Sequence, residues 1–514
     1  MDPASLTLAV FGTLDLCLRY GQELIYFCRE QRRLERDLED IALNVEGIWI
    51  KTEVQLDSLK RLWDSGSLAP TLQVHYADAV QRLRIKISTA ASDFTTIYPR
   101  SIAATTLTQK AKVVYLKRRL QEVVKDLEDW QRRFDPSWYL ITRIAESKVD
   151  RELESQTITK SHDSSASRLA EIRNAIKQSS SHQNEASSSV FVNPDMIEAD
   201  AERISGTSTY LSWYKTNGRR ILLDSTNFAG TNSSARRVHV RDLARLLLNV
   251  DPMSFGLLRC EGVLERHTNQ DTQFQFIFEI PKGLDSPKTL RTLLIEKQEC
   301  SLSHRVQLAK QLARSVMFVH TSGFVHKGIR PETLIIFSQE KEDMGPSFLI
   351  GFEQIRRAEA QTSFLGDLKW ERNLYRHPVR QGLWSEEAFT MQHDIYSLGV
   401  CLLEIALWRS FVCLEGDSIT PWSELDIDSA ILDKDAKRGG FAIKRRLTAL
   451  TKARLPSLVG DRYTNLVLVC LCCLDSGDDN IFNMQGLDIK DEDGIIIGVR
   501  YIENILLKIE ELLV

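Results

Sequence analysis

The first 150 residues repeat one pattern, in which apolar side chains recur every three or four positions with charged residues between them. This spacing places the apolar side chains on one face of an α-helix, and that face must be buried against a partner. Proline, which breaks helix interiors, stands only at expected helix ends, namely Pro3, Pro70, Pro99 and Pro136. Four such helices predict an all-α bundle over residues 1–150. The stripes are Leu34, Leu38, Ile41, Val45, Ile48, Leu59 and Leu62, then Tyr76, Val80, Leu83, Ile87, Ala90 and Phe94, then Val113, Leu116, Leu120, Val123, Leu127, Trp130 and Phe134.

The first expected helix, about residues 5 to 30, is the least charged of the four. It is therefore either the best-buried member of the bundle or a segment that can leave it. In the second case its apolar face could lie in a membrane interface, with nearby arginines from Arg29 to Arg36 meeting anionic lipid headgroups. The alternative is that these arginines form an ordinary solvated helix face. The apolar face consists of Leu6, Val10, Phe11, Leu14 and Leu18.

Residues 151–204 change character, because two runs of three serines and other polar stretches are too polar to build a core. Between them, Leu169, Ile172 and Ile176 stand at helical spacing. We predict a serine-rich linker with one short brace helix that could pack on either neighbour. Its serines are candidate phosphorylation sites, since added charge could detach such a helix.

Residues 205–514 begin with strand-like patterns and become mainly helical after about residue 300. The expected strands are Arg220–Asp224, Gly256–Glu265 and Gln273–Ile280. A β-rich start followed by a larger helical part predicts a two-lobed α+β domain. The whole chain is thus expected to be multi-domain, and 514 residues are too many for one ordinary domain.

The composition excludes several classes of protein. A charged fraction of 26% is typical of soluble globular chains, and a net charge of -4 offers no electrostatic case for a nucleic-acid partner. No run reaches the roughly 18 apolar residues of a membrane span, and Asp2 stands where a secretory signal is basic. Cys470, Cys472 and Cys473 lack zinc-ligand spacing, so we expect free thiols, no metal site and a cytoplasmic, reducing location.

Four segments stand in the order and spacing of protein kinase motifs. F-V-H-K-G-I-R-P-E-T-L-I-I-F at 324–337 resembles the kinase catalytic loop, and L-I-G-F-E at 349–353 stands where kinases have D-F-G. Y-R-H-P-V at 375–379 resembles Y-R-A-P-E, and residues 393–408 resemble the large-lobe helix that begins D-x-W-S-x-G. The C-terminal 300 or so residues therefore resemble a protein kinase-like domain.

The resemblance implies that the residues of phosphoryl transfer are lost. The catalytic Asp aligns with Gly328, the loop Lys with Arg330, the metal-binding Asn with Thr333 and the D-F-G Asp with Gly351. The strand expected to carry the ATP-binding Lys reads I-L-L-D and ends at Asp224, and no G-x-G-x-x-G precedes it. The resemblance therefore implies a pseudokinase with no catalytic residue, no metal and no expected cofactor, and leaves ATP binding open.

Residues with structural roles in the family are retained. The resemblance implies that His326 packs beneath the loop and that Asp394 anchors the loop backbone. Gly399, Leu402 and Leu403 match the apolar core of the large-lobe helix. We predict that these residues support the fold and take no part in catalysis.

The order of helical bundle, brace helix and degenerate kinase-like domain resembles the HeLo-type, prion-inhibition and propagation proteins of fungi. It is also similar to the mixed lineage kinase domain-like proteins of necroptosis. In those relatives the bundle attacks membranes once the second domain releases it. The resemblance implies a regulated cell-death or immune effector with protein partners, conditional recruitment to the plasma membrane, homo-oligomers on activation and no nucleic acid.

Two alternatives remain open on the sequence. The chain could be a scaffold that binds partners through both parts without acting on membranes. It could also be an active kinase in which Glu353, Asp367 or Asp394 supplies the missing carboxylate and Lys215 the missing cation. The positions of these groups relative to Gly328 would decide between activity and inactivity.

Overall fold

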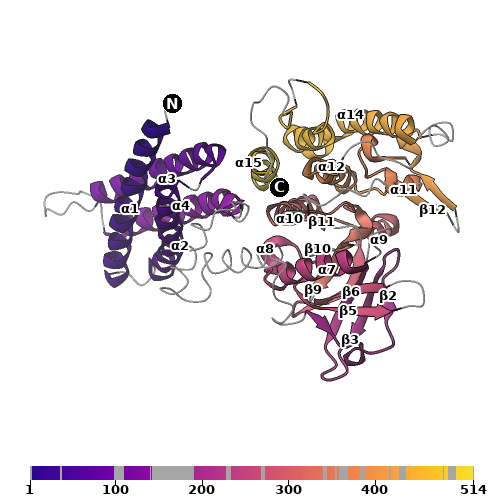
Figure 1. The fold of residues 1–514 in the computed structure, drawn as a ribbon. Helices are drawn as coiled ribbons and strands as arrows, with labels where there is room; N and C mark the ends of the chain where they lie inside the picture. The colour runs from indigo at the N-terminus through magenta and orange to yellow at the C-terminus, as the bar shows by residue number, and fades with distance from the viewer. Residues whose placement is uncertain are drawn as a thin grey trace. The chain divides into compact units, whose positions relative to one another are not determined.

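The computed structural model divides into two compact units, Met1–Arg173 and Asn174–Val514, which are described separately (Figure 1). The predicted brace helix lies outside the described residues, as do Glu353 and Asp367. The described residues are 3–34, 38–66, 68–97, 109–138, 140–141, 190–226, 233–267, 272–339, 344–352, 356–357, 369–382, 388–415, 418–427, 436–477, 480–483 and 494–512.

The first unit is all-helical, as the stripes predict. Helix α1 packs on α2 and α3, and α4 packs on α2 and α3. The apolar stripes form the core between these helices, and the half-buried Ile41 and Ile48 are exceptions. The helices are α1 (Pro3–Leu34), α2 (Glu39–Asp64), α3 (Pro70–Ile97) and α4 (Gln109–Trp138). The buried stripe residues include Leu38, Val45, Leu59, Leu62, Tyr76, Val80, Leu83, Ile87, Ala90, Phe94, Leu116, Leu120, Val123, Leu127, Trp130 and Phe134.

Aromatic side chains hold the end of this bundle together. The rings of Trp130 and Phe134 stack with centroids 4.5 Å apart, and the Tyr76 hydroxyl donates to the Ser137 carbonyl at 2.7 Å. Pro136, expected to mark a helix end, lies inside the last turn of α4. The helix continues past it to the buried Trp138, because packing of that indole outweighs the one backbone hydrogen bond that proline removes.

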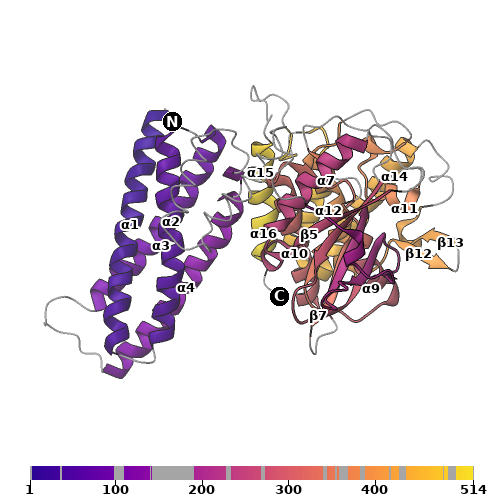
Figure 2. The same cartoon turned by 60° about the horizontal axis from the view of Figure 1, so that its bottom comes forward.

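The second unit begins with a six-stranded sheet of order β1-β5-β6-β4-β3-β2. Neighbouring strands are antiparallel except for the parallel pair β1–β5. Helix α7 (Ser233–Leu248) follows β4 and packs against β5 and β6 (Figure 2). The strands are β1 (Phe191–Val192), β2 (Glu202–Arg203), β3 (Thr209–Trp213), β4 (Arg220–Thr226), β5 (Cys260–His267) and β6 (Thr272–Glu279).

The sheet starts earlier than the expected boundary at residue 205. Strand β1 pairs with β5, where the Val263 amide donates to the Val190 carbonyl at 2.8 Å, and β2 pairs with β3. Residues 190–204 therefore belong to this unit and not to the linker. A strand of two residues is too short to show an alternating pattern, so the sequence does not reveal β1 or β2.

Helices α10, α12 and α14 form the other part of this unit (Figure 1), with the hairpin β12–β13 at its edge (Figure 2). The helices are α8 (Pro252–Phe255), α9 (Leu290–Glu296), α10 (Leu302–Thr321), α11 (Trp370–Asn373), α12 (Met391–Leu407), α14 (Ala436–Leu471, kinked at Gly460), α15 (Ile495–Tyr501) and α16 (Leu507–Glu510). Short helices are η3 (Pro194–Met196), η4 (Pro331–Thr333), η5 (Pro378–Arg380), η6 (Ser423–Leu425) and η7 (Ile502–Leu506). The remaining strands are β7 (Leu284–Thr289), β8 (Phe324–Val325), β9 (Leu334–Gln339), β10 (Ser347–Leu349), β11 (Arg356–Arg357), β12 (Val412–Glu415) and β13 (Ser418–Pro421).

Gly399 permits the closest approach between α12 and α14. A Cβ atom at this position would lie 2.7 Å from Cys470 Cβ and 3.2 Å from the Leu471 amide nitrogen. Only glycine fits without moving one of the helices. The nearby thiols are free, and burial raises the pKa of Cys470 far above its usual value.

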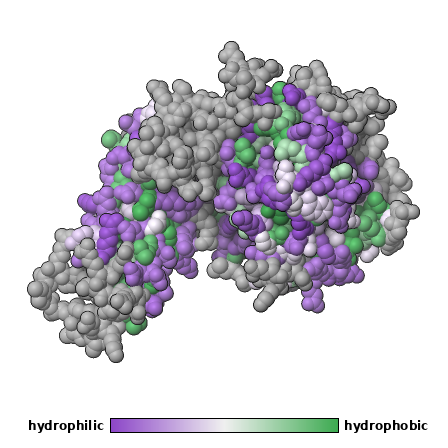
Figure 3. All heavy atoms as spheres, turned by 90° about the horizontal axis from the view of Figure 1, so that it is seen from below, coloured by the Kyte–Doolittle hydropathy of each residue, from purple (hydrophilic) through white to green (hydrophobic). Residues whose placement is uncertain are grey.

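The described surface is mixed in polarity. On the face shown in Figure 3, hydrophobic residues are scattered among hydrophilic ones. Within the described ranges, no helix combines the length and apolar character needed to cross a bilayer.

Candidate functional site

The loop after β8 is held by the carboxylate of Asp394, at the start of α12. Its Oδ2 accepts from the His326 amide at 2.7 Å and its Oδ1 from the Lys327 amide at 2.9 Å. The imidazole Nε2 of His320 lies 3.2 Å from Oδ2. Burial alone would raise the pKa of Asp394, but His320 and the His326 backbone bond hold it below its usual value. Asp394 is thus an ionised anchor for the loop, and both of its oxygens are occupied.

His326 links this loop to the segment after β10. Its Nδ1 accepts from the Gly328 amide at 3.2 Å, so its Nε2 carries the proton and donates to the Ile350 carbonyl at 3.1 Å. Burial lowers the pKa of His326 to about 4, and its ring packs against Phe352 with centroids 5.1 Å apart. A neutral, fully buried imidazole in this position joins two backbone segments and cannot reach a substrate.

Gly328 stands at the position that the resemblance to kinases aligns with a catalytic base, and a Cβ atom would fit there. A Cβ atom there would find its nearest neighbours at ordinary contact distance, with Arg330 Nη1 at 3.4 Å and the Gly351 carbonyl at 3.6 Å. The backbone would therefore accept a side chain. Position 328 thus has no side chain because its residue is glycine, although the backbone there has room for a Cβ atom.

Gly351 shows the opposite situation, because the Thr333 side chain fills the space that a side chain at position 351 would need. Thr333 Oγ1 accepts from the Arg330 amide at 3.1 Å and lies 2.9 Å from the Gly328 carbonyl. Gly351 has φ +82°, and a Cβ atom there would lie 2.3 Å from Thr333 Cγ2. A metal-binding side chain at position 351 would be strained and would clash, and the Thr333 hydroxyl is already committed to the loop backbone.

Asp224 ends the I-L-L-D segment of β4, where the resemblance to kinases leads us to expect an ATP-binding Lys. Its Oδ2 accepts from the Gly351 amide at 2.9 Å and from the Phe352 amide at 3.2 Å. Its Oδ1 accepts from the Thr209 hydroxyl at 2.9 Å, and the side chain is fully buried. An anion thus replaces the expected cation, and it binds the segment in which the metal-binding Asp is expected.

The aromatic ring of Phe352 secures this segment under the sheet. It packs against Phe276 and Phe278 of β6, with centroids 6.3 and 6.0 Å away. Alternation along β4 puts Asp224 on the same face as Leu222. Hydrogen bonds and apolar packing therefore join the sheet to residues 351–352 at one place.

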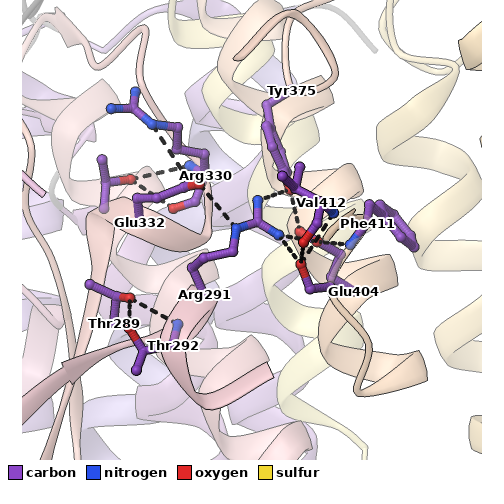
Figure 4. A network of polar contacts seen from close by, with 11 residues as sticks. Thr289, Arg291, Thr292, Arg330, Glu332, Tyr375, Glu404, Phe411 and Val412 are labelled. Carbon is purple, nitrogen blue, oxygen red and sulfur yellow. Dashed lines mark hydrogen bonds and ion pairs between the residues drawn. The ribbon is translucent and has the colours of Figure 1, made fainter. Parts of the chain in front are cut away.

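A buried ion network, which the sequence did not single out, ties the loop to the helices (Figure 4). Arg291 of α9 donates through Nε to Glu332 at 3.0 Å and through Nη1 to Glu404 at 2.9 Å. The Tyr375 hydroxyl donates to Glu404 at 2.7 Å and also contacts the Arg291 guanidinium. Burial would lower the pKa of Arg291, but Glu332, Tyr375 and Glu404 hold it well above its usual value. Only a charged residue inside the otherwise apolar pattern of residues 290–294 signals this network in the sequence.

The groups that would restore catalysis do not join this cluster in the part of the chain described. Lys215 is exposed in the turn between β3 and β4, whereas Asp224 pairs with Thr209 at the opposite end of that hairpin. Asp394 is fully engaged by backbone amides. Among the described residues, no group of three or more His, Cys, Asp or Glu side chains is arranged to hold a metal ion.

In the first unit, the apolar face of α1 points into the bundle. Val10 and Leu14 are buried, Phe11 and Leu18 are half-buried, and the side chain of Leu6 lies outside the described part. The Lys60 ammonium lies 5.9 Å from the centroid of the Phe11 ring. Any contact of this face with a membrane therefore requires α1 to leave its neighbours.

No family model and no curated protein matches this chain.

Proposed function

We propose that the chain is a catalytically inactive, protein kinase-like signalling protein whose N-terminal helical unit is a regulated cell-death or immune effector. In this proposal the second unit keeps a kinase-like architecture for binding and regulation. The observation that carries the proposal is the pair of hydrogen bonds from the amides of residues 351 and 352 to Asp224. Under this proposal, a buried anion stands where phosphoryl transfer needs a cation, beside a glycine where it needs a metal ligand.

Phosphoryl transfer depends on charge neutralisation and on a positioned base. Gly328 supplies no base, the Thr333 hydroxyl is used by the loop, and position 351 has no room for a carboxylate. Each 1.4 kcal/mol of lost transition-state stabilisation lowers the rate about tenfold. Loss of the base, the metal ligands and the cation together should therefore leave no measurable activity.

The arrangement of strands supports the kinase-like reading. Helix α7 is inserted between β4 and β5, and the loops that carry positions 328 and 351 leave from β8 and β10. Asp394 at the start of α12 anchors the first of these loops. These relationships agree with the order of motifs in the sequence and do not depend on any one of them.

Transfer of radiolabelled phosphate from ATP by the purified full-length chain tests inactivity. We expect no incorporation above a boiled control, with magnesium or manganese and a general acceptor protein. Incorporation that disappears in the Glu353→Ala variant would establish the active-kinase alternative and reject the proposal.

The effector role rests on α1, the helix whose apolar face must be released before it can act. Expression of residues 1–173 in cells should reduce viability, while the full-length chain should not, because the second unit restrains the first. The matched control is the same fragment carrying Val10→Asp and Leu14→Asp, checked for expression. Equal viability with all three proteins would reject the effector role.

The scaffold alternative is favoured by the burial of Val10 and Leu14, since a closed bundle can bind partners through its outer surface alone. It predicts that residues 1–173 leave vesicles intact and that the full-length chain captures a stable protein partner. Dye release from vesicles by residues 1–173 would exclude it.

A further inference from the structure

The first half of α14 is strongly basic although the whole chain is acidic. Residues 436–460 contain seven Lys and Arg and no Asp or Glu, in a chain of net charge -4. The helix buries its apolar side against the rest of the unit, where Leu447 and Leu455 are fully enclosed. The positive charges therefore gather on the solvent side of one helix.

Some of these charges have internal partners. Arg446 pairs with Asp426 at 2.6 Å, Arg454 pairs with Glu424 at 3.3 Å, and Lys444 is buried against Asp475. The charges of Lys444, Arg446 and Arg454 are therefore neutralised by acidic residues of the same unit.

The side chain of Lys437 lies outside the described part, which leaves three cations on the exposed face, namely Arg438, Arg445 and Lys452. They are seven residues apart, so each step is two helical turns, or about 10 Å, and they form one row. Within the described part of the chain, none of the three has an ion pair. Phe441 lies on the same face between the first two and keeps 37% of its surface exposed. We call these four residues the basic stripe.

We propose that the basic stripe docks the second unit onto an anionic lipid bilayer. A row of cations about 20 Å long on a convex helix matches a flat, negatively charged surface, and an aromatic ring between them suits the headgroup boundary. Single-stranded nucleic acid is bound through several aromatic platforms, and peptides through apolar anchors in pockets. The stripe offers one exposed aromatic side chain, so the bilayer is the partner that its chemistry fits best.

This inference goes beyond the proposed function and does not require it. It assigns lipid contact to the second unit, whereas the effector proposal assigns membrane damage to α1. Docking through the stripe would hold the chain at a membrane whether or not α1 is released.

Flotation of the full-length chain with vesicles tests the stripe. We expect binding to phosphatidylcholine vesicles that contain phosphatidylserine, weaker binding in high salt, and none to phosphatidylcholine alone. Each cation near such a surface contributes roughly fivefold, so the triple variant Arg438→Glu, Arg445→Glu, Lys452→Glu should lose at least about a hundredfold in affinity. The neutral triple Gln variant should show a smaller loss, and it covers the case in which charge reversal disturbs folding.

The matched control reverses three exposed cations that are spread over the unit, Arg266→Glu, Lys282→Glu and Arg409→Glu, and so changes net charge equally. It should bind like the unaltered chain. The inference would be overturned if the control variant lost as much affinity for vesicles as the stripe variants, or if both stripe variants kept their binding. It would also be overturned if the stripe bound DNA or polyglutamate but not vesicles. Dye release that depends on α1 can fail while flotation succeeds, so this result is separable from the effector proposal.

Discussion

The carboxylate of Asp224 and the amide of Gly351 are 2.9 Å apart, although 127 positions separate them in the chain. The same oxygen also accepts from the Phe352 amide, and both residues are fully buried. A carboxylate that accepts two backbone N–H groups inside a protein is a strong tether, because its alternative is an unsatisfied charge. This side chain supplies the hydrogen bonds that join the sheet to residues 351–352, next to the packing of Phe352 on β6.

Removing this tether should destabilise the second unit. We expect Asp224→Ala to lower the free energy of unfolding by about 2–4 kcal/mol, since two buried amides and the Thr209 hydroxyl lose their acceptor. Asp224→Asn should cost less, because one oxygen is kept. Urea denaturation followed by fluorescence measures both, with the exposed Asp200→Ala as control. An unchanged midpoint for Asp224→Ala would contradict the tether.

Gly328 and Gly351, which the resemblance to kinases aligns with catalytic carboxylates, should respond differently to substitution. Gly328→Asp should fold with nearly unchanged stability, because a Cβ atom there meets its nearest neighbour at an ordinary contact distance of 3.4 Å. Gly351→Asp should lose about 1–3 kcal/mol or more, because its φ is +82° and Thr333 lies in the way. Thermal denaturation of both variants provides the comparison. Equal stability losses would show that the space at position 351 is not restricted.

Stability should fall as the pH is lowered through the range in which His326 titrates. Its pKa is about 4 in the folded chain and about 6.5 when unfolded, so the unfolded state binds more protons below pH 6.5. The contribution of the neutral ring is complete above that pH and is lost progressively towards pH 4. At pH 5 the loss is about 2 kcal/mol.

Urea titrations between pH 7.5 and 4.5 measure this effect. The Asn variant of His326 keeps one polar contact and cannot titrate, so its stability should depend less on pH than that of the unaltered chain. Parallel profiles for the two proteins would contradict the assignment.

The ion network should be sensitive to loss of Arg291. Arg291→Met leaves the fully buried Glu404 without its guanidinium, although Glu332 keeps Arg330 at 3.7 Å, and we expect a loss of about 3–5 kcal/mol. Lys288→Met, which breaks the exposed pair of Lys288 with Glu296, should cost less than about 1 kcal/mol. Chemical denaturation distinguishes the two, and similar small effects would show that the buried network is not stabilising.

Local patterns in the sequence were sufficient to predict the helices of the first unit and the main strands of the second. Residues 220–224 and 273–280 were expected as strands and lie in β4 and β6. The stripes of the bundle were expected to be buried, and most of them are. Periodicity predicts these elements because burial of one face is imposed residue by residue along the chain.

The pairing of strands that lie far apart in the chain could not be predicted from local sequence patterns. The sheet begins at residue 191, because β1 finds its partner 72 positions later, at Val263. In the site, the resemblance to kinase motifs predicts missing side chains at 328 and 351, but the clash between Thr333 and a side chain at position 351 could not be predicted from the sequence.

The sequence by itself determined the main helices and strands, and it suggested a resemblance to kinases in which several chemical groups are missing. Only the tertiary structure decided what Asp224 and Arg291 do, because their partners come from other elements. A buried charge is stable only with oppositely charged or hydrogen-bonding groups around it, and those groups are brought together by folding and not by spacing along the chain.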